Sequence, residues 1–186
     1  TSLLVYIPYY VTGGVVPEGH RFLPFHLHMD KMVIQSPREE RFFSQELFQG
    51  KLLPLGSPKF DKVVAYEREK PKIPEEWKEK MEGKKVFFYN TSISSLLGDC
   101  EVALKKMEHV ISCFEGREDA ILVWRPHPLS ESTLKAMRPA AYEAYKRIQE
   151  RFVKEKRGIL DKITDASRTI AWCDAYLGEA SSSVVH

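Results

Sequence analysis

The second half of the chain alternates short apolar runs with longer amphipathic segments, and this alternation restricts the fold more than any other feature. The apolar runs predict short strands at residues 85–89, 121–124, 159–160 and 175–177. Between them, apolar residues recur at helical spacing over residues 103–114 and 134–152, and a brief helix is expected at about 165–172. Strands that alternate with helices of this length predict a parallel sheet covered by helices on both faces. We therefore expect an α/β fold.

Glycine and proline mark where these helices end. Gly116 and Gly158 follow the first two helical patterns, as glycine commonly does at a helix end. Pro139 lies inside the second pattern, where it removes a backbone donor and predicts a kink or a split.

The first half predicts a smaller set of strands, at residues 3–7, 31–35 and 52–55, with a long loop between the first two. Ser36 and Pro37 favour the start of a short helix. Residues 66–84 are dense in Glu, Lys and Pro and predict one amphipathic helix between Pro74 and Gly83. We expect three parts: a first unit at 1–65, a linker helix at 66–83 and a second unit at 84–186.

Composition excludes several classes of protein. Hydrophobic residues make up 43% and charged residues 29% of the 186 residues, which is typical of a soluble protein. The net charge of +2 argues against a nucleic-acid-binding protein. Three scattered cysteines without metal-finger spacing favour a reduced, intracellular chain, and no apolar run is long enough to span a bilayer. The chain begins inside an apparent strand, so we expect a piece of a longer protein.

Polar residues follow each predicted strand of the second half. The carboxyl ends of parallel strands meet at one edge of a sheet, so these residues become neighbours. They are Asn90, Thr91, Ser92, Arg125, His127, Asp161, Glu179, Ser181, Ser182 and Ser183. Such a set of hydroxyls, carboxylates, a guanidinium and an imidazole predicts a site for a nucleotide or a sugar phosphate.

The strand at residues 121–124 leads into the most informative motif, Arg125-Pro126-His127-Pro128. Two prolines stiffen the exit from the strand. An arginine can hold a phosphate with two parallel hydrogen bonds, and a histidine can transfer a proton near neutral pH. We expect Arg125 and His127 to be catalytic.

Simpler interpretations remain for the other residues. The serine run and residues 90–92 are equally typical of helix caps, and Asp161 is typical of a turn or cap. His20, His26 and His28 suggest a metal cluster, but their spacing fits no standard site and no cysteine supports it. We therefore expect no metal and no cofactor.

Three motifs resemble those of the CDP-glycerol glycerophosphotransferase family, bacterial enzymes that build teichoic-acid-like cell-wall polymers. Residues 56–61 (GSPKFD) resemble the family's G-x-P-R-x-D turn, and residues 125–128 (RPHP) resemble its R-x-H-P motif. Residues 174–182 (DAYLGEASS) resemble its D-x-x-x-x-D-Y-S-S region. The three motifs occur in the family's order and at similar spacing, and the resemblance covers the chain from about residue 31 to its end.

The resemblance implies a partial GT-B architecture, made of two Rossmann-like halves with a nucleotide-linked donor between them. Residues 1–65 would be the tail of the acceptor-side half, and residues from 84 an incomplete donor-binding half. His127 would lie near the transferred phosphoryl group, and Ser181 and Ser182 would contact the donor phosphates. The implied partners are CDP-glycerol and a polymer or glycan acceptor, in the cytoplasm at the inner face of the membrane. Peripheral membrane association would come from parts outside this chain, and this chain alone would be inactive.

The chain departs from the family pattern at two places. Lys59 replaces the arginine of the first motif, and Glu179-Ala180 replaces the family's Asp-Tyr. Two alternatives therefore stay open: a sugar-nucleotide glycosyltransferase with the GT-B fold, and a non-catalytic nucleotide-sensing module.

Overall fold

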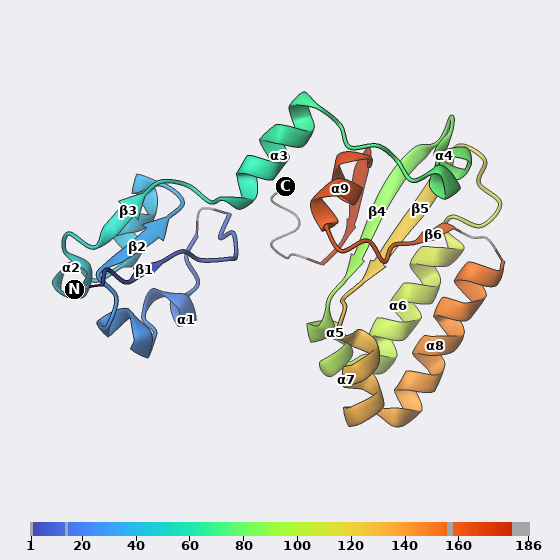
Figure 1. The fold of residues 1–186 in the computed structure, drawn as a ribbon. Coiled ribbons are helices and arrows are strands. Elements are labelled where there is room, and N and C mark those ends of the chain that lie inside the picture. The colour runs from blue at the N-terminus through green and yellow to red at the C-terminus, as the bar shows by residue number, and fades with distance from the viewer. Residues whose placement is uncertain (1, 14, 156–157, 180–186) are drawn as a thin grey trace. The chain divides into compact units, whose positions relative to one another are not determined.

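A computed structural model describes residues 2–13, 15–155 and 158–179. The chain divides between Glu69 and Lys70 into two compact units. Both are α/β, with a parallel sheet flanked by helices (Figure 1), as the strand and helix pattern predicts.

The first unit contains a parallel three-stranded sheet with the strands in sequence order. Its elements are β1 (Val5–Tyr6), α1 (Glu18–Arg21), the 3-10 helix η1 (Pro24–Leu27), β2 (Lys31–Ile34), the 3-10 helix η2 (Pro37–Phe42), α2 (Gln45–Phe48), β3 (Leu52–Pro54) and α3 (Lys59–Arg68). Apolar side chains of β2, including Met32 and Ile34, pack against Phe43 and Phe48 to form its core. The helix predicted at Ser36 exists as η2, although the Ser36 side chain does not cap it.

The second unit contains a parallel four-stranded sheet in the order β6-β5-β4-β7. Its elements are α4 (Glu75–Met81), β4 (Lys85–Thr91), α5 (Ile93–Leu97), α6 (Cys100–Ser112), β5 (Ala120–Pro126), α7 (Ser130–Met137), α8 (Pro139–Lys154), β6 (Gly158–Leu160), α9 (Ala166–Ala171) and β7 (Ala175–Gly178). The predicted split at Pro139 is confirmed, because α7 ends at Met137 and α8 begins at Pro139.

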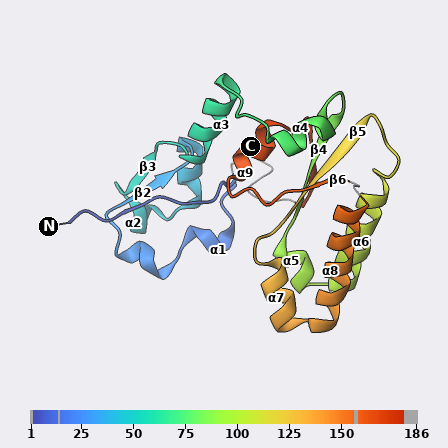
Figure 2. The same ribbon diagram turned by 45° about the vertical axis from the view of Figure 1, so that its right-hand side comes forward.

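Side chains of β5 alternate between two cores, one on each face of the sheet. Leu122 and Trp124 pack on one face with residues of α6, α7 and α8. Ile121 and Val123 pack on the other face, where Trp77 and Met81 of α4 meet Trp172. Figure 2 shows α6 and α8 side by side on their face of the sheet. The sheet is therefore covered on both faces, as predicted.

Segment 70–81 belongs to this second unit. Besides Trp77 and Met81 in the core, the Trp172 indole donates a hydrogen bond to the Pro71 carbonyl at 2.6 Å. The helix expected as a linker therefore forms one layer of the second unit.

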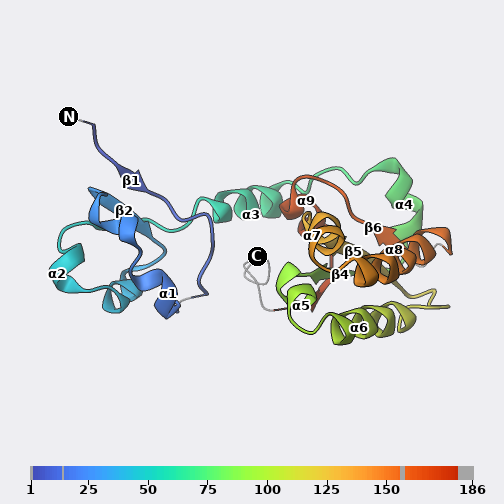
Figure 3. The same ribbon diagram turned by 90° about the horizontal axis from the view of Figure 1, so that it is seen from below.

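Strand order places a topological switch point beside β4. The chain proceeds from β4 outward through β5 to β6, and then returns to the opposite side of β4 as β7. In open α/β sheets, ligands bind outside the carboxyl ends of the strands, next to such a reversal. Figure 1 shows α5 and α7 beyond the carboxyl ends of β4 and β5, and Figure 3 views the chain from that side.

Candidate functional site

The carboxyl edge of the second sheet carries two groups of polar residues. The first lies at the switch point, where β4 and β7 end. Asn90 pairs in register with Gly178 on one side and with Arg125 on the other. Just beyond, the Ser92 hydroxyl donates a hydrogen bond to the Glu179 carboxylate. The sequence predicts that residues after these strands become neighbours, and the structure brings Asn90, Ser92 and Glu179 together as predicted.

Gly178 permits the close approach of β7 to β4. Its φ of +147° is rarely adopted by other residues, and a Cβ there would lie 2.4 Å from the Asn90 carbonyl oxygen. Only glycine fits this position without displacing the backbone that carries Asn90 and Glu179.

Thr91 does not present its side chain to this edge. The residue is 2% exposed, and its hydroxyl accepts a hydrogen bond from the Trp124 indole at 3.2 Å. The hydroxyl therefore satisfies a buried donor of the core. Thr91 contributes to the edge through its backbone carbonyl, which accepts a hydrogen bond from the His127 N–H at 3.1 Å.

Arg125 is committed to intramolecular contacts. One terminal nitrogen lies 2.7 Å from a carboxylate oxygen of Asp161 and 2.7 Å from the Ile163 carbonyl. The other nitrogen donates to the Thr164 carbonyl at 3.3 Å. The Asp161 side chain is fully buried, so the ion pair satisfies a carboxylate that would otherwise be costly to bury.

Asp161 also has the local role that the sequence suggests. Its second oxygen accepts a hydrogen bond from the Ile163 N–H at 2.8 Å, closing a turn after β6. The ion pair with Arg125 is the part that sequence reasoning missed.

His127 is oriented by its own backbone neighbourhood. Its Nδ1 accepts a hydrogen bond from the Leu129 N–H at 3.2 Å. In the neutral ring the proton therefore lies on Nε2, which makes Nε2 a donor. A donor at this position suits an anionic oxygen of a ligand better than it suits proton abstraction.

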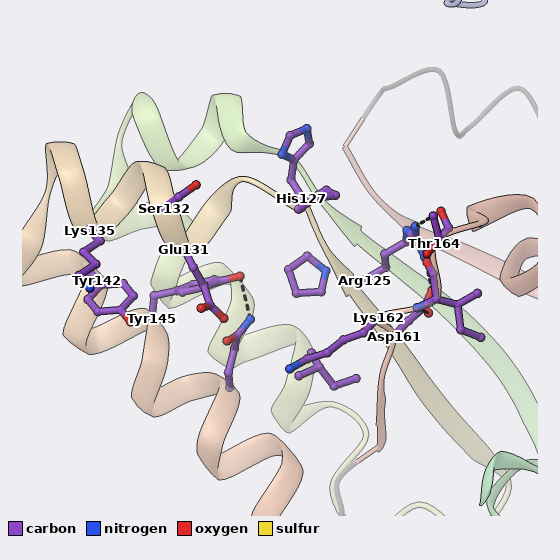
Figure 4. A pocket seen from close by; sticks show the side chains of 15 residues that line it. Arg125, His127, Glu131, Ser132, Lys135, Tyr142, Tyr145, Asp161, Lys162 and Thr164 are labelled. Atoms are coloured by element: carbon purple, nitrogen blue, oxygen red, sulfur yellow. Dashed lines mark hydrogen bonds and ion pairs between the residues drawn. The ribbon is translucent and has the colours of Figure 1, made fainter. Parts of the chain in front are cut away.

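A cavity of about 710 Å³ opens beside these residues (Figure 4). Its walls are residues 125–128 after β5, residues 160–164 after β6, and side chains of α7 and α8. This volume is in the range of small-molecule sites. Arg125 and His127 border the cavity, whereas residues 90–92 and Glu179 do not.

The cavity carries two cations that sequence reasoning did not single out. Lys135 of α7 and Lys162 of the segment after β6 line it, and neither ammonium pairs with a carboxylate in the described part of the chain. In Figure 4, Arg125 points toward residues 161–164, while Lys162 extends across the cavity toward α8. For Lys135, the sequence offers only an acidic residue four positions earlier, Glu131. Such pairs are common on exposed helices and do not indicate a binding site.

A buried tyrosine forms part of the α8 wall. The Tyr145 hydroxyl accepts a hydrogen bond from the Gln149 amide at 2.9 Å, and the ring is fully buried. Burial raises the pKa of the Tyr145 phenol, so the group stays neutral at physiological pH. It therefore places a neutral polar group behind the cavity wall rather than on an exposed surface.

The remaining predicted residues, Ser181, Ser182 and Ser183, lie outside the described residues, as does Ala180. Within the described ranges, no cluster of three or more His, Cys, Asp or Glu side chains could hold a metal. His26 packs among Phe22, Phe25 and Phe48 in the first unit. Also within those ranges, no helix has the length and apolar character needed to cross a membrane.

Fold and site together define a parallel α/β domain with a ligand-sized, partly cationic cavity at the carboxyl edge of its sheet. Comparison of the chain with protein-family models, curated proteins and solved structures finds no match.

Proposed function

We propose that the second unit binds the nucleotide-linked donor of a glycerophosphotransferase with the GT-B architecture. The transferase would move glycerol phosphate from CDP-glycerol to a hydroxyl of a polymer or glycan. The observation that carries the proposal is the position of the Arg125-Pro126-His127-Pro128 motif in the wall of a cavity at the carboxyl edge of a parallel sheet. The order of the three family-like motifs supports the same donor.

The reaction is a displacement at phosphorus. The acceptor hydroxyl oxygen forms a bond to the β-phosphorus of CDP-glycerol, and the anhydride bond to CMP breaks, with its electron pair leaving on CMP. The hydroxyl proton passes to solvent. Charge on the phosphate oxygens is what a protein can stabilise in such a reaction.

In this scheme His127 donates from Nε2 to a phosphate oxygen, since its Nδ1 is already an acceptor for Leu129. Glu179 is a hydrogen-bond acceptor, so it fits a ribose or glycerol hydroxyl rather than a phosphate. Ser92, hydrogen-bonded to Glu179, orients that carboxylate. The proposed place of action is the cytoplasmic side of the membrane, where the acceptor polymer would be extended.

Two other functions use the same edge. A sugar-nucleotide glycosyltransferase would also need a carboxylate for sugar hydroxyls, as Glu179 provides. The ion pair between Arg125 and Asp161 favours a nucleotide-sensing module, because the paired guanidinium is less able to stabilise charge on a reacting phosphate.

Calorimetric titration of the chain separates these functions, with CDP-glycerol, CMP and UDP-glucose as ligands. The glycerophosphotransferase predicts that CDP-glycerol and CMP bind at least about tenfold more tightly than UDP-glucose, a difference of about 1.4 kcal/mol. His127→Ala should weaken CDP-glycerol binding about tenfold, as expected for loss of a hydrogen bond to a charged group. His109→Ala, at an exposed position of α6, is the matched control.

Tighter binding of UDP-glucose would assign the chain to glycosyl transfer. CMP binding that His127→Ala leaves unchanged, together with no preference for CDP-glycerol, would favour the sensor. No binding of any nucleotide would refute all three functions.

A further inference from the structure

Arg125 has few donors left for a ligand. Its guanidinium is engaged with the Asp161 carboxylate and with the carbonyls of Ile163 and Thr164, and its side chain is 13% exposed. These contacts use three of its five N–H donors, and turning the guanidinium fully toward a phosphate would break a buried ion pair and leave an uncompensated carboxylate. A cation with no such intramolecular partner is better suited to hold an anion in this cavity.

The contacts of Arg125 instead fix the segment that follows β6. Asp161 is bound at both carboxylate oxygens, and its N–H donates to the Trp124 carbonyl at 2.7 Å. Ile163 and Thr164 are held through their carbonyls. Lys162 lies between these anchored residues, so its backbone position is set by Arg125.

Lys162 has the properties of an anion-binding residue. Its side chain lines the cavity, has no carboxylate partner among the described residues, and extends across the cavity toward α8 in Figure 4. Lys135 lines the opposite wall from α7 and is likewise unpaired there. In Figure 4 the Glu131 side chain lies between Lys135 and Lys162, so an anion in the cavity gains favourable electrostatic energy chiefly from Lys162.

We infer that Lys162 is the principal cation that binds the diphosphate of the donor in this cavity, and that Arg125 is a positioning residue that acts through Lys162. The identity of the donor rests on the proposed function. The binding of a diphosphate by Lys162 does not.

Inorganic pyrophosphate is the probe for the first part, because it carries the diphosphate without a nucleoside. Calorimetric titration of the full chain should show that Lys162→Met weakens pyrophosphate binding about tenfold, the effect of one charged hydrogen bond. Lys162→Arg should restore most of the affinity. Lys106→Met, which removes the same charge from an exposed position of α6, should change the affinity less than twofold.

Equal losses for Lys162→Met and Lys106→Met would overturn the assignment, because they would reflect net charge alone. The salt dependence provides a second measurement. Raising the salt concentration should weaken wild-type binding more steeply than binding to Lys162→Met, since one fewer charge contacts the anion.

A thermodynamic cycle tests the positioning role. The double variant Arg125→Met/Asp161→Asn removes both charges, so no carboxylate is left buried without a partner. If Arg125 acts through Lys162, adding Lys162→Met to this variant should cost less than twofold in affinity. If Arg125 contacts the anion, the two losses should multiply, which would overturn the positioning role.

Circular dichroism and thermal unfolding show whether the double variant folds. Should it fail, Arg125→Lys serves instead. It keeps a cation for Asp161 but loses the fork that reaches Ile163 and Thr164 together. Weakened pyrophosphate binding in Arg125→Lys, again without further loss from Lys162→Met, would support the positioning role, and multiplied losses would overturn it.

The two proposals fail in different ways. Pyrophosphate binding that depends on Lys162, without binding of CDP-glycerol, would refute the proposed function alone. CDP-glycerol and pyrophosphate binding that Lys162→Met leaves unchanged would refute the role of Lys162 alone.

Discussion

At the scale of single residues, Thr91 shows how a strand-end hydroxyl can belong to the core. Its hydroxyl is the acceptor for the buried Trp124 indole. Thr91→Val keeps the shape but leaves that donor without a partner, which should lower the free energy of unfolding by about 1–3 kcal/mol. Urea unfolding followed by Trp fluorescence measures this change.

The same variant should leave nucleotide and pyrophosphate affinity unchanged, because the side chain does not face the cavity. Thr133→Val on α7 makes the same chemical change away from the Trp124 indole and should cost less. Loss of ligand binding by a stably folded Thr91→Val protein would show that Thr91 belongs to the site after all.

His26 is a second residue whose environment determines its chemistry. It is 3% exposed, its Nδ1 accepts a hydrogen bond from the Leu23 N–H at 3.1 Å, and its Nε2 is buried without a partner among the described residues. Burial lowers the pKa of His26, so the folded first unit holds the neutral ring.

Protonation of His26 therefore favours unfolding. Its stabilising contribution is present above the unfolded pKa of about 6.5 and is lost as pH falls from there toward the folded pKa, by at most about 1.4 kcal/mol per pH unit. Unfolding of wild-type protein and His26→Gln between pH 7.5 and pH 5 measures the difference. His28→Gln, at an exposed position, should keep the wild-type pH dependence; an identical slope in His26→Gln would contradict the assignment.

At the scale of elements, α5 depends on a contact from a distant helix junction. Arg138, between α7 and α8, donates hydrogen bonds to the carbonyls of Leu97 at 2.6 Å and Gly98 at 3.2 Å. These carbonyls lie at the end of α5, where helical partners are lacking. Arg138→Gln should destabilise α5 locally by about 1 kcal/mol.

Amide hydrogen exchange measures this effect. Exchange should accelerate in α5 and change little in α6, because the Arg138 guanidinium donates its hydrogen bonds to carbonyls at the end of α5. Arg147→Gln, a change of the same kind within α8, should leave exchange in α5 unaffected. Uniform acceleration across the second unit would instead indicate global destabilisation.

The elements that the sequence predicts are those with a strong apolar period or a clear break. The β5 strand follows from a buried apolar run. The split at Pro139 follows from the lack of a backbone N–H in proline. By contrast, α5 has five residues and needs the Arg138 contact, and α3 buries none of its side chains. Neither has enough periodic signal to be read from sequence.

For the candidate site, the sequence predicts which residues lie at the carboxyl edge but not how their side chains are oriented. Which residues reach the carboxyl edge follows from the order of strands and loops, so Asn90, Arg125 and His127 could be placed there. Which way each side chain turns depends on packing. The order of strands and loops therefore could not predict that Arg125 pairs with Asp161. Nor could it predict that Lys162 lines the cavity as a cation with no carboxylate partner among the described residues.

At the scale of the whole molecule, the two units each have a core of their own, and the boundary between them decides which fragments can fold. The composition change places the second unit's start at residue 84, whereas the compact unit starts at Lys70. Fragment 70–186 keeps α4, with Trp77 and Met81 in the core and the Pro71 carbonyl bound to the Trp172 indole. Fragment 84–186 loses all three.

We therefore expect fragment 70–186 to unfold cooperatively in urea, and fragment 84–186 to be less stable by at least about 3 kcal/mol, the usual cost of removing one large buried aromatic side chain. Trp77→Ala within fragment 70–186 should reproduce much of this loss, whereas Glu79→Ala, at an exposed position of the same helix, should not. Equal stability of the two fragments would show that α4 is a linker in energetic terms, and the unit that carries the cavity would then begin at β4.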